Sequence, residues 1–95
     1  MDRVVYLNML YDLYKDLFTE KQQMYFEAYY FENLSLGEIA ENNNVSRNAV
    51  HKRIKHVEEL LNNYEEELGL YKKEQEILSI LDDDKKEEVK KILNG

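Results

Sequence analysis

The chain has 95 residues, a net charge of −7 and neither cysteine nor proline. The missing cysteine excludes disulfides and thiolate zinc sites, and the missing proline leaves long helices uninterrupted. No apolar run approaches the ~18 residues of a membrane span, and the N-terminus lacks the basic start and cleavage site of a signal peptide. We therefore expect one all-α domain over residues 1–95, located in the cytoplasm and not in a membrane.

Apolar residues at helical spacing predict a first helix from about Arg3 to Asp16. They form two stripes: Val4, Leu7, Tyr11, Tyr14 and Phe18 on one, and Tyr6, Leu10, Leu13 and Leu17 on the other. A helix that is apolar over so wide an arc needs two packing partners. These are either two neighbours in its own chain or one neighbour and another subunit.

Thr19 and Gln22 have the spacing of a capping box and predict a second helix from about Glu20 to Phe31. Its expected core residues are Met24, Tyr25, Ala28, Tyr29 and Phe31. The aromatic cluster also suits stacking on single-stranded bases, but no basic side chains are interleaved with it. Helical spacing favours core packing.

A second capping box, Ser35 with Glu38, predicts a short helix from Leu36 to Glu41 or Asn42. The asparagine run at 42–44 then predicts a tight turn, because asparagine competes for backbone hydrogen bonds and tolerates the left-handed conformation.

Ser46 is the expected cap of a long helix that reaches about Leu68. Its apolar residues alternate four and three apart, at Val50, Ile54, Val57, Leu61, Tyr64, Leu68 and Tyr71. This is the period of a coiled-coil seam, so we expect a homodimer held by the first helix and this seam. A substitution of Leu61 by Asp weakens such a dimer if its side faces the partner. The alternative is a monomer whose own helices cover both faces.

Beyond Gly69, which ends or bends the long helix, two further helices are expected. The first carries Ile77, Leu78, Ile80 and Leu81; the second begins at Asp82, Asp83 and Asp84 and ends at Lys90 and Lys91, before Gly95. Three consecutive carboxylates do not converge on one ion, so the triplet favours a helix cap over a metal site.

Charge is distributed unevenly along the chain. Residues 1–45 carry −5, residues 46–57 carry +4 without a single acidic side chain, and residues 58–95 carry −6. The one net-positive stretch therefore coincides with the start of the long helix.

The stretch from Leu34 to Val57 matches a helix-turn-helix. This motif needs an apolar–small pair where the helices cross, a turn, an apolar plug, and a capped second helix with an inward stripe. The matching residues are Ile39 and Ala40, then Asn44, Val45 and Ser46, then Val50 and Ile54. The sequence thus predicts a helix-turn-helix at about 35–58 in a three-helix core, with a long exit helix and C-terminal helices.

If that stripe faces inward, a set of polar and basic side chains remains to contact DNA: Ser46, Arg47, Asn48, His51, Lys52 and Lys55. Arg47 and Lys52 can donate to guanine, and Asn48 can pair with adenine in both directions. Arg53 and His56 lie more to the side. The alternative is a solvated surface that binds nothing, but solubility alone does not require twelve residues without an acid in so acidic a chain.

Enzymatic chemistry has no candidate residues in the sequence. His51 and His56 are five apart, which does not place two imidazoles on one helix face, and the glycines are isolated. We expect no catalytic residue, metal, cofactor or small-molecule substrate.

Residues 19–68 resemble the YlxM family, small bacterial proteins similar to region 4 of sigma factors. The resemblance lies in the KQ-x-x-Y-x-E-x-YY run, the SL-x-EIAE helix, the VSR-x-AV turn and the long exit helix. It implies a sigma region 4-like core, also comparable to a winged helix without its wing. It further implies a regulatory role linked by gene neighbourhood to the signal recognition particle.

Two positions depart from the family pattern: Asn43 and Asn44 stand where relatives tend to have an apolar residue and a glycine. Asn44 can adopt a positive φ at a cost that glycine avoids, and Asn43 leaves the helix crossing less well filled. The alternative function is an interaction protein that contacts the RNA or a protein of the signal recognition particle and does not bind DNA.

Overall fold

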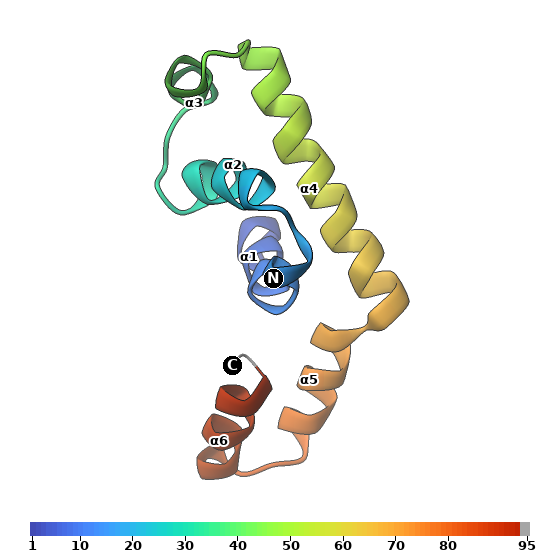
Figure 1. The fold of residues 1–95 in the computed structure, drawn as a ribbon. Coiled ribbons are helices and arrows are strands. Elements are labelled where there is room, and N and C mark those ends of the chain that lie inside the picture. Colours follow the sequence, from blue (N-terminus) through green and yellow to red (C-terminus); the bar gives the residue numbers. More distant parts are fainter. Residues whose placement is uncertain (94–95) are drawn as a thin grey trace.

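The computed structural model describes residues 1–93, which form helices joined by short turns, with no strand in that range (Figure 1). The elements are α1 (Arg3–Tyr14), the 3₁₀ turn η1 (Lys15–Leu17), α2 (Glu20–Tyr30), α3 (Leu36–Asn43), α4 (Arg47–Leu68), α5 (Leu70–Ser79) and α6 (Asp83–Leu93). The expected all-α class is confirmed. Gly95, expected to follow the last helix, lies outside the described residues.

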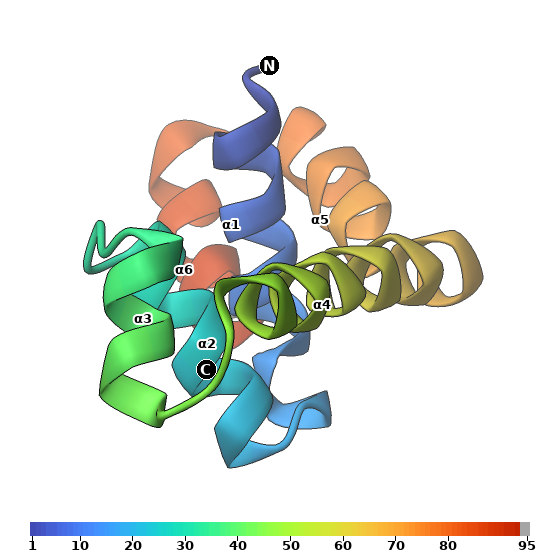
Figure 2. The ribbon, with the colours of Figure 1, turned by 90° about the horizontal axis from the view of Figure 1, so that it is seen from above.

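Helix α4 runs along most of a molecule that measures 48 × 25 × 24 Å (Figure 1). From its N-terminal end, α4 is accompanied in turn by α3, α2 and α1, and the chain then turns back through α5 and α6 (Figures 1 and 2). Gly69 ends α4 with φ of 62°, a left-handed conformation that glycine adopts without strain. The expected start and end of this helix are confirmed.

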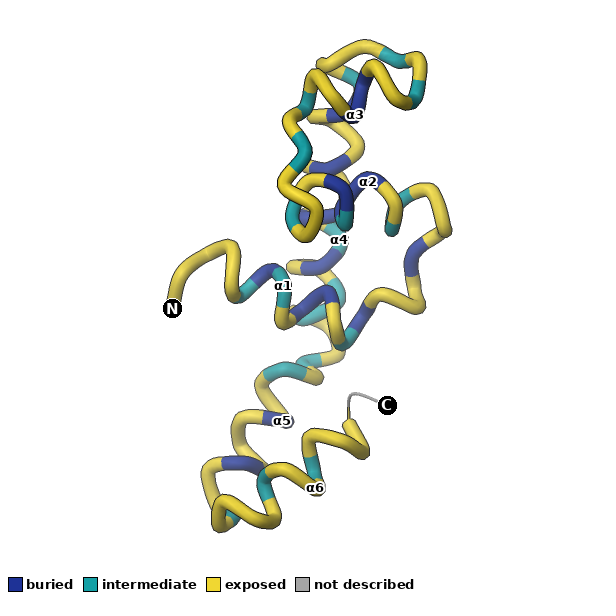
Figure 3. The backbone as a smooth tube through the Cα atoms, turned by 90° about the vertical axis from the view of Figure 1, so that its left-hand side faces the viewer, coloured by how far each residue is buried: buried dark blue, intermediate teal, exposed yellow. Residues whose placement is uncertain are grey.

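The main core forms where α1, α2 and the middle of α4 meet (Figure 3). Its buried side chains are Leu7, Leu10, Tyr11, Tyr14, Phe18, Phe26, Val57 and Leu61. The ring of Phe26 stacks on Tyr11 with 4.3 Å between centroids. Both stripes of α1 contribute to this core, so its wide apolar arc finds several partners within one chain.

Helix α1 ends two residues earlier than expected, at Tyr14, and η1 replaces its last turn. The reason is tertiary. Phe18 must enter the core, and the Gln23 side-chain amide in α2 donates to the Lys15 carbonyl at 2.7 Å, which fixes the tighter turn.

The residues of α2 that are buried differ in part from those expected. Tyr25 and Ala28 are buried as expected, but Phe26, which was not among the expected residues, is completely buried. Helix α2 packs against α4 through Tyr25 and Ala28 and against α1 through Phe26, so its buried arc is rotated. Three expected core residues are consequently exposed: Met24, Tyr29 and Phe31.

The apolar seam of α4 faces the inside of its own chain. Val50, Ile54, Val57 and Leu61 are at most 3% exposed, and only Leu68 of the described seam is clearly exposed. The interpretation of this seam as a dimer contact is therefore wrong from Val50 to Leu61, because α1, α2 and α3 already cover it. A substitution of Leu61 by Asp would disrupt the core, so it cannot report on dimerisation.

Helices α5 and α6 form a hairpin below this core (Figures 1 and 3). Glu65, near the end of α4, ties the hairpin to the core: its carboxylate accepts from the Tyr14 hydroxyl at 2.8 Å and from the backbone N–H groups of Tyr71 and Lys72. The Asp82 carboxylate accepts from the Lys85 N–H at 3.0 Å, as expected of a helix cap.

None of the described helices has the length and apolar character needed to span a membrane.

Candidate nucleic-acid interface

Helix α3 and the turn after it have the predicted helix-turn-helix geometry. The Ser35 hydroxyl accepts from the Glu38 N–H and the Glu38 carboxylate accepts from the Ser35 N–H, both at 3.1 Å. The Ser35 N–H that donates to this carboxylate, and after it the Ser35 side chain, lower the pKa of Glu38. Asn44 occupies the turn at φ 58° and ψ 40°, and the Val45 N–H donates to the Ala40 carbonyl at 3.1 Å. The expected positive φ of Asn44 is confirmed.

A small core holds the two helices of the motif together and joins them to α2. It contains Tyr25, Ala28, Ile39, Ala40, Val50 and Ile54, with Val45 packed against it at intermediate exposure. The predicted apolar–small pair, plug and inward stripe therefore all lie where the template requires. Asn43 sits at the edge and donates its amide to the Ile39 carbonyl at 2.8 Å, which carries α3 one or two residues beyond its expected end.

The six predicted contact residues are exposed on the first turns of α4. The Ser46 side-chain oxygen accepts from the Ala49 N–H at 3.0 Å and caps the helix. Asn48 and Lys52, and likewise His51 and Lys55, are four residues apart, so each pair shares a helix face. Among the described residues, no carboxylate lies within ion-pair distance of Arg47, Lys52 or Lys55. The basic side chains are thus presented to solvent with their charge unneutralised by a close partner.

Arg53 and His56 lie on the flank of α4, as the sequence indicated. The Arg53 guanidinium lies 5.5 Å from the centre of the Tyr25 ring in α2, at cation–π distance. Together with Thr19, Lys21 and Gln22 they line a hollow of about 220 Å³ between α2 and α4. Sequence reasoning missed this grouping, because periodicity along one helix carries no information about which other helix will lie beside it.

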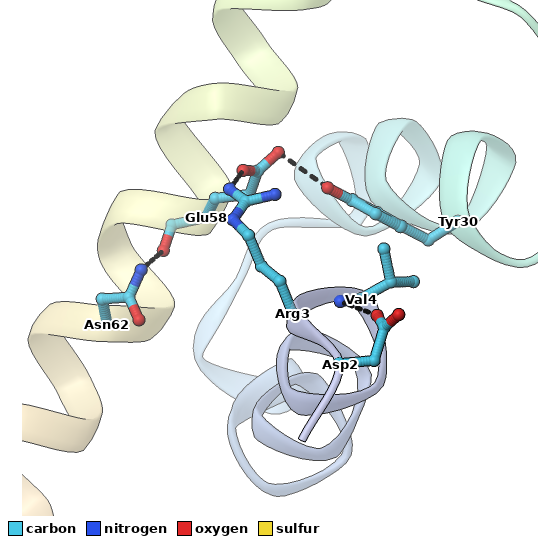
Figure 4. A network of polar contacts seen from close by, with 6 residues as sticks. All are labelled: Asp2, Arg3, Val4, Tyr30, Glu58 and Asn62. Carbon is cyan, nitrogen blue, oxygen red and sulfur yellow. Dashed lines mark hydrogen bonds and ion pairs between the residues drawn. The ribbon is translucent and has the colours of Figure 1, made fainter.

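A polar cluster fixes the direction of α4 below the basic turns (Figure 4). Glu58 is only 7% exposed, and its carboxylate accepts from Arg3 of α1 and, at 3.0 Å, from the Tyr30 hydroxyl of α2. Burial, and then this hydrogen bond, raise the pKa of Tyr30 to about 12. One carboxylate therefore joins the three core helices and orients the helix that carries the basic face.

Groups of three or more histidine, aspartate and glutamate side chains that could hold a metal ion are absent from residues 1–93. His51 and His56 stay on separate parts of the α4 surface, one on the basic face and the other at the hollow. The arrangement suits hydrogen bonding and charge attraction to an anionic polymer.

Comparison with known proteins agrees with this geometry. Residues 1–94 match the family model UPF0122, described as "Putative helix-turn-helix protein, YlxM / p13 like". A UPF0122 protein of Desulforamulus reducens is 57% identical over 67 residues, which cover 70% of this chain and 57% of that protein. UPF0122 proteins of Oceanobacillus iheyensis and Halalkalibacterium halodurans are 45% and 46% identical over 86% and 85% of this chain, and 78% and 77% of their own lengths. With the motif formed and the match spanning nearly every residue, the chain belongs to the UPF0122 family of YlxM / p13-like helix-turn-helix proteins.

Proposed function

We propose that this protein binds duplex DNA through the exposed face of α4 and acts as a regulatory protein in the cytoplasm. The observation that supports this most is a solvent-exposed basic face on a helix whose opposite side is locked in the core. The contact residues are Ser46, Arg47, Asn48, His51, Lys52 and Lys55, all exposed. A helix held in this way can enter a major groove without reorganising, which limits the entropy lost on binding.

Binding is expected to be weak and strongly dependent on salt. The segment 46–57 carries +4, whereas the rest of the chain carries −5 before it and −6 after it. Phosphate attraction supplies most of the affinity of a nonspecific DNA complex, and the surrounding acidic side chains oppose it. Low ionic strength is therefore the condition under which binding is measured.

The test is a fluorescence titration of labelled duplex DNA at low salt. We expect the double variant Arg47→Glu with Lys52→Glu to lose binding. The matched control, Lys72→Glu with Lys73→Glu, makes the same charge change on exposed residues of α5 and keeps most of the affinity. An unmodified protein that does not bind, or a double variant that binds as well as it does, contradicts the proposal.

A homodimer would place two such faces on one duplex, about 34 Å apart for successive turns. Of the two surfaces expected to form it, α1 keeps several exposed apolar side chains: Val4, Val5 and Met9 are 43%, 49% and 37% exposed. Val5→Asp is expected to lower the mass measured by light scattering, whereas Ile92→Asp on α6 leaves it unchanged. A mass near 11.5 kDa that does not rise with concentration excludes the dimer.

The alternative is an interaction protein of the signal recognition particle. The exposed Ile80 and Ile92, 81% and 79% accessible, favour a protein partner. RNA is less suited, because the deep major groove of A-form RNA does not admit a helix. Recovery of signal recognition particle components from lysate, unchanged by nuclease and combined with no DNA binding, would support this function in place of the first.

A further inference from the structure

We propose that the hollow between the N-terminal end of α2 and the middle of α4 binds a backbone phosphate of the same DNA whose groove α4 enters. This inference rests on the proposed function and extends it to a second, separate contact. Figure 1 shows the two elements meeting at this point, although 30 residues or more separate them in sequence. The hollow is lined by Thr19, Lys21, Gln22, Tyr25, Arg53 and His56.

The chemistry of the lining selects an anion. It includes two permanent cations, Lys21 and Arg53, together with His56, and it contains no carboxylate. A larger hollow between α2 and α3 has the opposite character, because Glu20, Glu27 and Glu32 line it. In a chain of net charge −7, a concave site that is lined by cations and free of acids repels phosphate less than the acidic surface around it.

A buried and unpaired hydroxyl is the second sign of a missing ligand. Tyr25 is 1% exposed, and its phenolic oxygen is buried without a hydrogen-bond partner among the described residues. Native proteins rarely leave such a group unsatisfied. Tyr25 helps to line the hollow, so a phosphate bound there would supply the acceptor that its hydroxyl lacks once the ring shifts to expose this oxygen, and Arg53, which lies over the ring, would donate to the same group.

The size and position of the hollow indicate the source of the phosphate. Its volume of about 220 Å³ is below the ~300–1,000 Å³ of sites that enclose whole small molecules. Lys52 is four residues before His56, so the two share a face of α4 and connect the hollow to the groove-facing residues. A strand that follows α4 at Lys52 therefore passes the hollow, and a backbone phosphate fits it better than a free nucleotide does.

The experiment measures the affinity for one duplex as a function of salt, using the full chain and two single variants, Lys21→Gln and Arg53→Gln. Each variant is expected to lower the slope of log K against log salt by ~0.9 and to weaken binding several-fold, for every duplex sequence tested. Lys73→Gln on α5 makes the same charge change far from the hollow and is expected to keep the slope. Lys21 is exposed, so its variant keeps the native melting temperature even if Arg53→Gln loses stability with its ring contact.

The outcomes separate this inference from the proposed function. If the unmodified protein binds DNA and both variants behave like Lys73→Gln, the hollow takes no phosphate and only this inference fails. If the unmodified protein does not bind, both fail. A further titration asks whether the hollow prefers a strand phosphate or a soluble one: sodium phosphate or sodium chloride is added to the protein–DNA complex at equal ionic strength. Equal displacement of DNA supports a strand phosphate, whereas saturation by phosphate that Arg53→Gln abolishes shows a soluble anion and overturns the assignment to DNA.

Discussion

The first half of α4 and the α5–α6 hairpin differ in both packing and charge. Val50, Ile54 and Val57 are at most 3% exposed, and the outward side of the same turns is basic. In the hairpin, Leu78 is the buried apolar residue of α5, and α6 buries none of its described residues. The basic face proposed to contact DNA thus stands on a tightly packed helix, whereas the hairpin is close to neutral, with seven acidic and six basic residues over 70–93, and leaves apolar side chains exposed to solvent.

The largest effect that separates these regions is expected from truncating one apolar side chain in each. Leu61→Ala removes a fully buried side chain and is expected to lower the free energy of unfolding by about 2–5 kcal/mol. Ile92→Ala, on a residue 79% exposed, is expected to change it by less than about 0.5 kcal/mol. Urea unfolding followed by circular dichroism measures both. Equal losses would show that α6 is packed as firmly as the core.

A smaller effect is expected from the two left-handed residues that end α3 and α4. Asn44→Ala is expected to cost about 1–2 kcal/mol, because alanine at a φ of 58° places its Cβ close to the following carbonyl. Asn44→Gly removes that strain and is expected to leave stability unchanged or slightly raised.

Gly69→Ala is the corresponding change at the start of the hairpin. A Cβ at Gly69 would meet no atom closer than 3.9 Å, so its cost is backbone strain alone. The melting temperatures of Asn44→Ala, Asn44→Gly and Gly69→Ala compare the backbone strain in the two turns. An alanine at position 44 that melts like the glycine variant would show that the turn relaxes, and that it does not hold the angle between α3 and α4.

The smallest effect is expected at high pH, from the tyrosines that join the core helices. Burial, followed by hydrogen bonds to Glu65 and Glu58, raises the pKa of Tyr14 and of Tyr30 from 10 to about 12. A raised pKa in the folded state means that the neutral phenol stabilises the fold below pH 10. That stability is lost as pH rises from 10 towards 12.

We therefore expect the melting temperature to fall over that interval in proportion to the number of these phenols present. Tyr14→Phe should lower the stability at neutral pH and make the fall above pH 10 less steep. Tyr29→Phe is the control, because Tyr29 is 36% exposed and has no hydrogen bond to a carboxylate in the described structure. The same slope in both variants would show that Tyr14 titrates freely in the folded protein.

Local signals in the sequence were enough to place most helix ends. Thr19 with Gln22, Ser35 with Glu38, and Ser46 each satisfy backbone donors within three residues of themselves. A capping interaction of this kind depends only on near neighbours in the chain, so spacing alone predicts it. For the same reason the helix-turn-helix at about 35–58 and the exposure of its basic side chains follow from the order of residues along the chain.

Tertiary structure alone decided which apolar faces are covered and which distant residues meet. The heptad spacing of α4 is equally compatible with a second subunit and with α1 and α2 of the same chain, and the structure places Leu61 in the intrachain core. Phe26 is buried because α1 lies where its ring points, and Lys21 comes near Arg53 because α2 crosses α4 there. Periodicity determines the direction of a side chain around its own helix axis, but the neighbour it meets depends on how all the helices pack together.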